Sequence, residues 1–218
     1  MPLFIAVAAT FLQQTLTYMS HLVVPIAAPE LSREFGLPIA LAGIHMAIIY
    51  LFGSICQLFA GGFIQKYGAA RMSQVALVST AIGLMMGAIG ELWAYGLGAF
   101  IIGAGSAVST PASSDILARF APPKHAPLIF SIKQTGVPVG SLIGGLLIPF
   151  LLTISVYSAA LRTPIHLDAY GTAFVTGLIV YIVVIALEPI RPHFDADRRP
   201  DVKLTFSGAS ETMKIVVN

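Results

Sequence analysis

The sequence is 218 residues long; 56% of the residues are hydrophobic and only 10% are charged. Soluble domains carry roughly 25% charged residues, so this composition favours an integral membrane protein in contact with the lipid bilayer. The formal net charge of +2 gives no indication of a nucleic-acid partner, and the single cysteine, Cys56, excludes a disulfide framework and a cysteine metal site.

Six apolar stretches are long enough to cross a bilayer as helices, which takes roughly 20 residues each. They cover about 3–27, 39–63, 73–92, 94–117, 126–154 and 169–188. The first stretch is too long for the apolar core of a signal peptide, so we expect it to be retained. We therefore predict an all-α membrane protein with a six-helix transmembrane bundle over residues 1–188. Turn-like or charged pieces, beginning with "PELSREFGLP", are expected to separate the helices.

The distribution of lysine and arginine predicts the orientation. With a cytoplasmic N-terminus, the outside holds only Arg33 and Arg162, and the inside holds Lys66, Arg71, Arg119, Lys124, Arg191, Arg198, Arg199, Lys203 and Lys214. We expect a multi-pass protein of the plasma (cytoplasmic) membrane with both termini inside. Residues 189–218 are predicted to be a cytoplasmic central loop. Ser210 and Glu211 could then start a further helix that is apparently truncated.

Polar and small residues form one face on four of the predicted helices when residues are placed 100° apart. The stripes are Thr10, Gln13, Gln14, Thr17 and His21; Gly43, Tyr50, Ser54, Gln57 and Gly61; Ala99, Ser106, Ser109, Thr110 and Ser113; and Lys133, Gly136, Val137, Gly140 and Gly144, flanked by Gln134, Pro138, Ser141 and Gly145. Such groups in hydrocarbon either line a wet path or join helices by hydrogen bonds. We expect the first, second, fourth and fifth helices to surround something polar, and the third and sixth to lie outside.

The candidate residues for a substrate path are Gln13, Gln14, Thr17, Tyr50, Gln57, Ser109, Lys133 and Gln134. Lys133 is the one charge clearly inside a predicted helix, roughly 10 Å from its start at 1.5 Å per residue. It either attracts an anionic substrate, or snorkels to the surface and pairs with Asp115. The expected helix-packing residues are Gly136, Pro138, Gly140, Gly144 and Gly145. We expect no metal site and no cofactor.

The segment "GGFIQKYGAARM", Gly61 to Met72, resembles the cytoplasmic signature of the major facilitator superfamily. Its conformational motif would be Gly62, Gln65, Lys66, Gly68 and Arg71. Gln65 stands where the family usually has an aspartate, which weakens the charge-mediated latch expected there. The segment "TPASSDILARFAPPKHAPLIFSIKQTGVPVGSLIGG" is similar to the cyanate and nitrate/nitrite porter-like branch of that superfamily.

The resemblance implies a permease, one N-terminal six-helix half of a secondary transporter that moves a small-molecule substrate by alternating access. Its partner would be a C-terminal six-helix half or a second copy. A buried lysine with no acidic residue deep in any predicted helix favours a small organic or inorganic anion. The alternative is a truncated or split fragment that does not transport. A remote alternative, an intramembrane serine protease at Ser106, lacks a histidine base in the last predicted helix, so we expect no enzyme.

Overall fold

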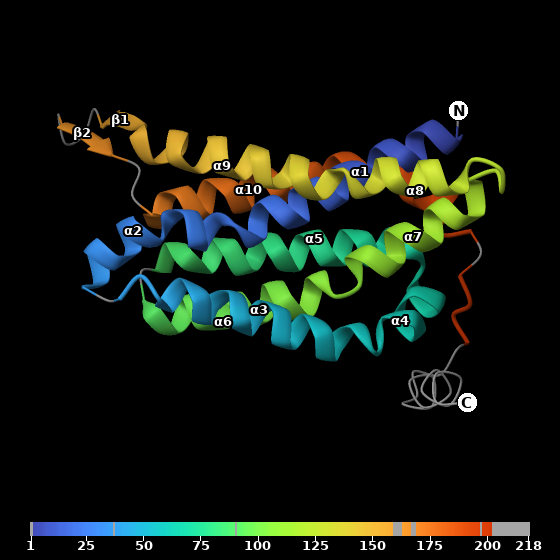
Figure 1. The fold of residues 1–218 in the computed structure, drawn as a ribbon, viewed down its shortest axis with the longest axis horizontal. Helices are drawn as coiled ribbons and strands as arrows, with labels where there is room; N and C mark the ends of the chain where they lie inside the picture. Colours follow the sequence, from blue (N-terminus) through green and yellow to red (C-terminus); the bar gives the residue numbers. More distant parts are fainter. Residues whose placement is uncertain are drawn as a thin grey trace.

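The computed structural model describes residues 2–36, 38–89, 91–158, 163–166, 169–196 and 198–201. The long helices run roughly parallel, and the N-terminus lies at the same end of the bundle as α4 and α8 (Figure 1). The helices are α1 (Pro2–His21), α2 (Val23–Phe35), α3 (Leu41–Gln57), α4 (Ala60–Tyr67), α5 (Ala69–Met85), η1 (Met86–Ile89), α6 (Leu92–Ser106), α7 (Ser109–Phe120), α8 (Ala126–Gln134), α9 (Gly136–Thr153), α10 (Ala169–Leu187), η2 (Glu188–Ile190) and α11 (Arg191–Phe194).

Four helical stretches are long and apolar enough to cross a membrane: Pro2–Arg33, Ala69–Ile89, Leu92–Phe120 and Ala126–Thr153. Helices α3 and α4 together would make a fifth span, with a bend of 64° between them. Helix α10 contains the shorter apolar stretch Gly171–Ile185. The predicted all-α membrane class is confirmed. The division into six spans stays a prediction.

Three of the long helical stretches are interrupted shortly before a proline. The breaks lie at Leu22, at residues 107–108 and at Thr135. Each comes three or four residues before a proline: Pro25, Pro111 and Pro138. Because proline has no N–H, the carbonyl four residues earlier loses its helical partner, and the helix is weakened at that point. Pro138 therefore divides the span that was predicted over 126–154 into α8 and α9.

The first expected separator is largely helical. In "PELSREFGLP", residues up to Phe35 continue α2, and Pro29 lies inside that helix. The helix ends at Gly36, whose φ of +65° is a left-handed conformation that glycine adopts without strain. The first separator is thus charged but helical as far as Phe35, because a proline in a helix does not always end it.

The α5 helix lies inside the helical bundle. It is packed between α6 and α10, and it is the most buried of the four long spans. A Cβ atom on Gly83 would lie 2.7 Å from the carbonyl oxygen of Gly98 in α6, and one on Gly177 in α10 would lie 2.8 Å from that of Ala81. Small residues thus let two helices approach the α5 backbone within this unit. The expectation that the third predicted helix lies outside a polar path stays a prediction.

A two-stranded antiparallel hairpin follows α9. Strand β1 (Ser155–Ser158) pairs with β2 (Thr163–His166), with Ser155 opposite His166 and Ser158 opposite Thr163. The hairpin lies at the end of the bundle opposite the N-terminus (Figure 1). It was not predicted. The helix expected to start at Ser210 and Glu211 lies outside the described residues, as does Arg162.

Candidate functional site

The polar stripe of α1 is closed against α7. Gln13 Nε2 donates to Ser109 Oγ at 2.8 Å and to the Ser109 carbonyl oxygen at 3.2 Å. Thr17 Oγ1 lies 3.4 Å from Ser109 Oγ and donates to the Gln13 carbonyl at 2.9 Å. All three side chains are buried. The sequence predicted these residues as one group, and their bonds join the first and fourth spans. Their contact with a substrate stays a prediction that requires α1 and α7 to part.

The glycines of α9 pack against the backbone of α1. A Cβ on Gly140 would lie 2.3 Å from the Thr15 carbonyl oxygen, and one on Gly136 would lie 2.9 Å from that of Phe11. A Cβ on Gly144 would only reach ordinary contact, at 3.5 Å, with Met19. Gly145 has no heavy atom within 4 Å of this position, and Pro138 is exposed. The five predicted packing residues thus divide between a tight contact with α1 and an open face.

Gln14 belongs to the same α1–α9 contact. Its Cβ lies 3.0 Å from the position that a Cβ on Gly136 would occupy, and the residue is 1% exposed. Its Oε1 atom has no hydrogen-bond partner among the described residues. A buried amide oxygen without a hydrogen-bond partner costs free energy.

Lys133 is buried among neutral oxygens. The residue is 2% exposed, and its Nζ donates to Ser114 Oγ at 3.0 Å and to the Thr110 carbonyl oxygen at 3.3 Å, both on α7. Asp115, the partner expected in the snorkelling interpretation, pairs with Arg119 at 2.5 Å within α7. That expected pair is therefore not formed. An ammonium group has three N–H donors, so one donor of Lys133 has no protein acceptor among the described residues.

Two surfaces of the unit carry polar and small residues in place of large apolar ones. On α3 and α4 the predicted stripe is exposed throughout, namely Gly43, Tyr50, Ser54, Gln57 and Gly61. On α8 and α9 the corresponding residues are Gln134, Pro138 and Gly145, with Ser141 half-buried. The Cβ positions of Gly43 and Gly61 meet no atom within 4 Å. Beside these stripes, exposed leucine and isoleucine side chains such as Leu51 and Leu146 form surfaces suited to lipid.

The conformational motif connects α4 to α5. Gly62, Gln65 and Lys66 lie on α4, Gly68 joins the two helices with a φ of +96°, and Arg71 lies in the first turn of α5. Lys66 Nζ lies 5.6 Å from the centroid of the Tyr67 ring.

A carboxylate that the sequence analysis did not single out completes the motif. Asp195, just after α11, accepts hydrogen bonds from the backbone N–H groups of Ala70 at 2.8 Å and Arg71 at 3.0 Å. Burial raises the pKa of the Asp195 carboxyl, and these two hydrogen bonds oppose that shift. The sequence contained a signal for this contact. Phe194, the residue before Asp195, is an aromatic residue in a segment rich in charged residues and proline.

A second polar group holds the end of α10 near the motif. Glu188 accepts a hydrogen bond from Gln74 Nε2 at 2.8 Å and one from Arg191 Nε at 2.9 Å. Arg71 lies 3.9 Å from the same carboxylate. Because Glu188 is exposed, these contacts contribute little individually, but together they place Arg71 beside the segment that follows α10.

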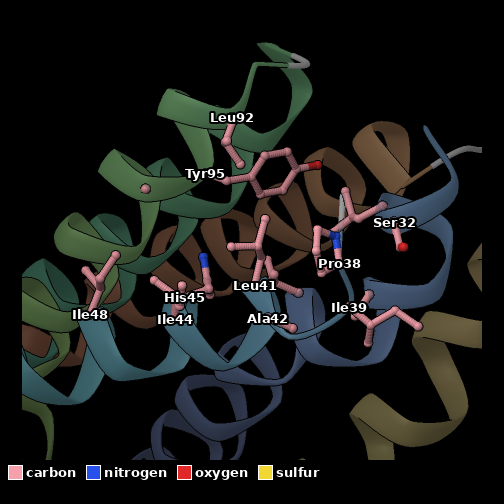
Figure 2. Close-up of a pocket in the computed structure, with 14 residues that line it drawn as sticks. Ser32, Pro38, Ile39, Leu41, Ala42, Ile44, His45, Ile48, Leu92 and Tyr95 are labelled. Atoms are coloured by element: carbon pink, nitrogen blue, oxygen red, sulfur yellow. The ribbon is translucent and has the colours of Figure 1, made fainter. Parts of the chain in front are cut away.

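An apolar cavity of about 230 Å³ lies away from all of these residues, between α2, α3 and α6. Figure 2 shows the His45 ring and the Tyr95 ring pointing into the space between Leu41, Ile44 and Leu92. Its lining is almost entirely apolar, and it includes none of the predicted path residues. A charged solute has few partners there, so this cavity is not the candidate path.

Comparison with known proteins supplies the family. The sequence model of the Major Facilitator Superfamily matches residues 3–214. The chain is 28% identical over 150 residues to "Uncharacterized transporter YybO" of Bacillus subtilis (strain 168), which covers 68% of this chain and 34% of the relative. It is 25% identical over 154 residues to "Uncharacterized MFS-type transporter Rv2994" of Mycobacterium tuberculosis (strain ATCC 25618 / H37Rv), covering 69% of this chain and 34% of the relative.

The matched segment thus spans about a third of the length of these relatives. The family match covers nearly the whole chain, and it agrees with the signature at Gly61–Met72 and with the apolar helices. The chain is an integral membrane protein of a transporter family rather than an enzyme family, and it belongs to the Major Facilitator Superfamily.

Proposed function

We propose that this chain is one half of a secondary transporter that moves a small organic or inorganic anion across the plasma membrane by alternating access. The proposal rests on the burial and the hydrogen-bond partners of the Lys133 side chain. The side chain is buried against two neutral oxygens of α7, with one N–H donor left over. A buried cation without an anionic partner is costly, and an anionic substrate would supply that partner.

The surroundings of Lys133 support the same interpretation. Gln134 is exposed beside it on α8, and Thr110 is exposed on the facing surface of α7. Ser109, the next residue, is bonded to Gln13 of α1. An anion that reaches Lys133 therefore meets the edge of the contact between α1 and α7. Parting of that contact would open the polar stripe of α1 to it.

The exposed stripes on α3–α4 and α8–α9 favour a second helical unit as the partner of this half. Polar groups facing lipid are costly, and small residues at a surface permit close approach of another helix. We infer that a C-terminal six-helix half, or a second copy of the chain, covers both stripes. The native mass in mild detergent separates a pair from a single 23.0 kDa chain, which as a half would be inactive in transport. The predicted orientation then puts α8 and the N-terminus at the cytoplasmic end.

The test is anion uptake into proteoliposomes by the complete transporter, with labelled nitrate, cyanate and acetate as probes. Lys133→Ala removes the cation, and Lys124→Ala, in the exposed turn before α8, is the matched control. A hydrogen bond to a charged group contributes about 1.5–3 kcal/mol, which corresponds to a rise in KM of about 10- to 150-fold. An unchanged KM in Lys133→Ala would remove Lys133 from the path.

The alternative of an intramembrane protease has no support in the site. Ser106 Oγ donates to the Gly103 carbonyl oxygen of its own helix at 3.3 Å. This is a local helical bond, and it gives the hydroxyl no base that could accept its proton.

A further inference from the structure

The segment after α10 folds back across the end of the bundle that carries the N-terminus and α8 (Figure 1). Phe194 is 3% exposed and lies edge-on to the Phe120 ring of α7, with 5.2 Å between ring centroids. His193 stacks on the same ring at 5.7 Å. Further along, the Arg199 N–H donates to the Gln65 carbonyl oxygen at 2.8 Å. The segment is thus attached to both α7 and α4.

The centre of this attachment is Asp195. A helix begins with backbone N–H groups that have no helical acceptor, and a side chain just before the helix usually accepts from one of them. The residue before α5 is Gly68, which has no side chain, so α5 has no local cap. Asp195 instead accepts from Ala70 and Arg71, from a position 125 and 124 residues further along the chain.

The geometry of Gly68 depends on this carboxylate. A Cβ atom at Gly68 would lie 2.3 Å from Asp195 Oδ1, so no other residue fits while the carboxylate is in place. The φ of +96° also disfavours a side chain at this position. The bend between α4 and α5 and the position of Asp195 are therefore set together.

Burial of the Asp195 carboxylate carries a cost. The residue is 6% exposed, and its burial disfavours the ionised form that accepts both hydrogen bonds. The positive charges of Arg191 and Arg198 act in the opposite direction and favour the ionised form. A buried carboxylate at a helix start that has a glycine in place of a capping side chain indicates a positional role.

We propose that Asp195 is a positioning residue that fixes the α4–α5 loop and ties the segment after α10 to this half, so that loop, segment and helices move as one body. The part concerning movement rests on the proposed transport function. It follows that a linker to any further half would stay attached to this half at least as far as Arg199, beyond the end of α10.

The first experiment measures the loop directly and needs no transport. Ala70→Cys, at a residue that is only 9% exposed and whose N–H donates to Asp195, is introduced into the full chain with Cys56→Ser, and its reaction with a water-soluble maleimide is timed. Asp195→Asn should speed the reaction about 2- to 30-fold, the range expected for the loss of one helix cap. Asp201→Asn, at an exposed aspartate, should leave the rate unchanged. An equal rate in Asp195→Asn and in the unaltered background overturns the proposal.

The second experiment leaves Asp195 in place, so it stands even if Asp195→Asn does not fold. Gln65→Cys with Arg199→Cys, again with Cys56→Ser, should form a disulfide, because backbones that share a hydrogen bond lie near the usual Cα separation of about 4.4–6.8 Å. Uptake by the complete transporter should be equal in the oxidised and reduced forms. No disulfide, or loss of uptake on oxidation alone, overturns the proposal. Absence of uptake in both forms counts against the proposed function instead, while the disulfide still tests the attachment of the segment and the labelling rate still tests Asp195.

Discussion

The tight contact between α9 and α1 allows a matched test on a single helix. Gly140→Ala places a Cβ atom 2.3 Å from the Thr15 carbonyl oxygen, which is backbone and cannot rotate away. Ordinary contact begins at 3.4 Å, so the two helices must separate by about 1 Å. Overpacking of this kind costs about 1–3 kcal/mol.

The expected consequence is a lower thermal stability. At about 2–4 °C per kcal/mol for a chain of this size, Gly140→Ala should lower Tm by about 2–12 °C. The assay heats the purified chain in mild detergent and measures the monodisperse fraction that remains. The control is Gly145→Ala, five residues further along α9, where no atom lies within 4 Å.

The control variant should show no fall in Tm. Alanine is a better helix former than glycine by up to about 1 kcal/mol, so Gly145→Ala should leave Tm unchanged or raise it. Equal losses at Gly140 and Gly145 would mean that the loss does not arise from the contact between α9 and α1. Unchanged stability in Gly140→Ala would mean that α1 and α9 are not in backbone contact. Either result refutes the reasoning.

Three further predictions concern other contacts. Ser109→Ala removes the hydroxyl acceptor of Gln13, and it should cost about 0.6–1.7 kcal/mol, measured as a loss of Tm in detergent. Gly83→Ala, with the Gly98 carbonyl oxygen 2.7 Å away, should lower Tm, whereas Gly96→Ala, with no atom within 4 Å, should not. Burial raises the folded-state pKa of Asp195, so its stabilising contribution is fully present below the unfolded pKa of about 3.9 and is lost as the pH rises through the folded value. Lowering the pH from 7 towards 4 should therefore raise the Tm of the unaltered chain relative to Asp195→Asn.

The family and the general architecture could be predicted because they depend on local sequence. Each apolar stretch is long enough to cross hydrocarbon, and a helix satisfies its own backbone hydrogen bonds there. The breaks that the structure places before Pro25, Pro111 and Pro138 follow a rule of the same local kind. The Gly61–Met72 signature also lies within a short stretch, and the family match over residues 3–214 agrees with it.

The role of individual polar and small residues could not be predicted in the same way. Gly140 and Gly145 lie on one helix and look equivalent in the sequence, yet one meets a backbone carbonyl and the other meets no atom. Asp115 was a reasonable partner for Lys133 until the structure paired it with Arg119, one turn along its own helix. Each outcome depends on which neighbouring helix lies across the contact.

The sequence by itself determined where the long apolar helices lie and which of their faces carry polar groups, because these properties depend on residues a few positions apart. Only the tertiary structure decided that Gln13 is satisfied by Ser109, that Lys133 has neutral partners and that Asp195 caps α5. Those contacts join residues 19 to 125 positions apart, and only the packing of whole helices brings such residues together.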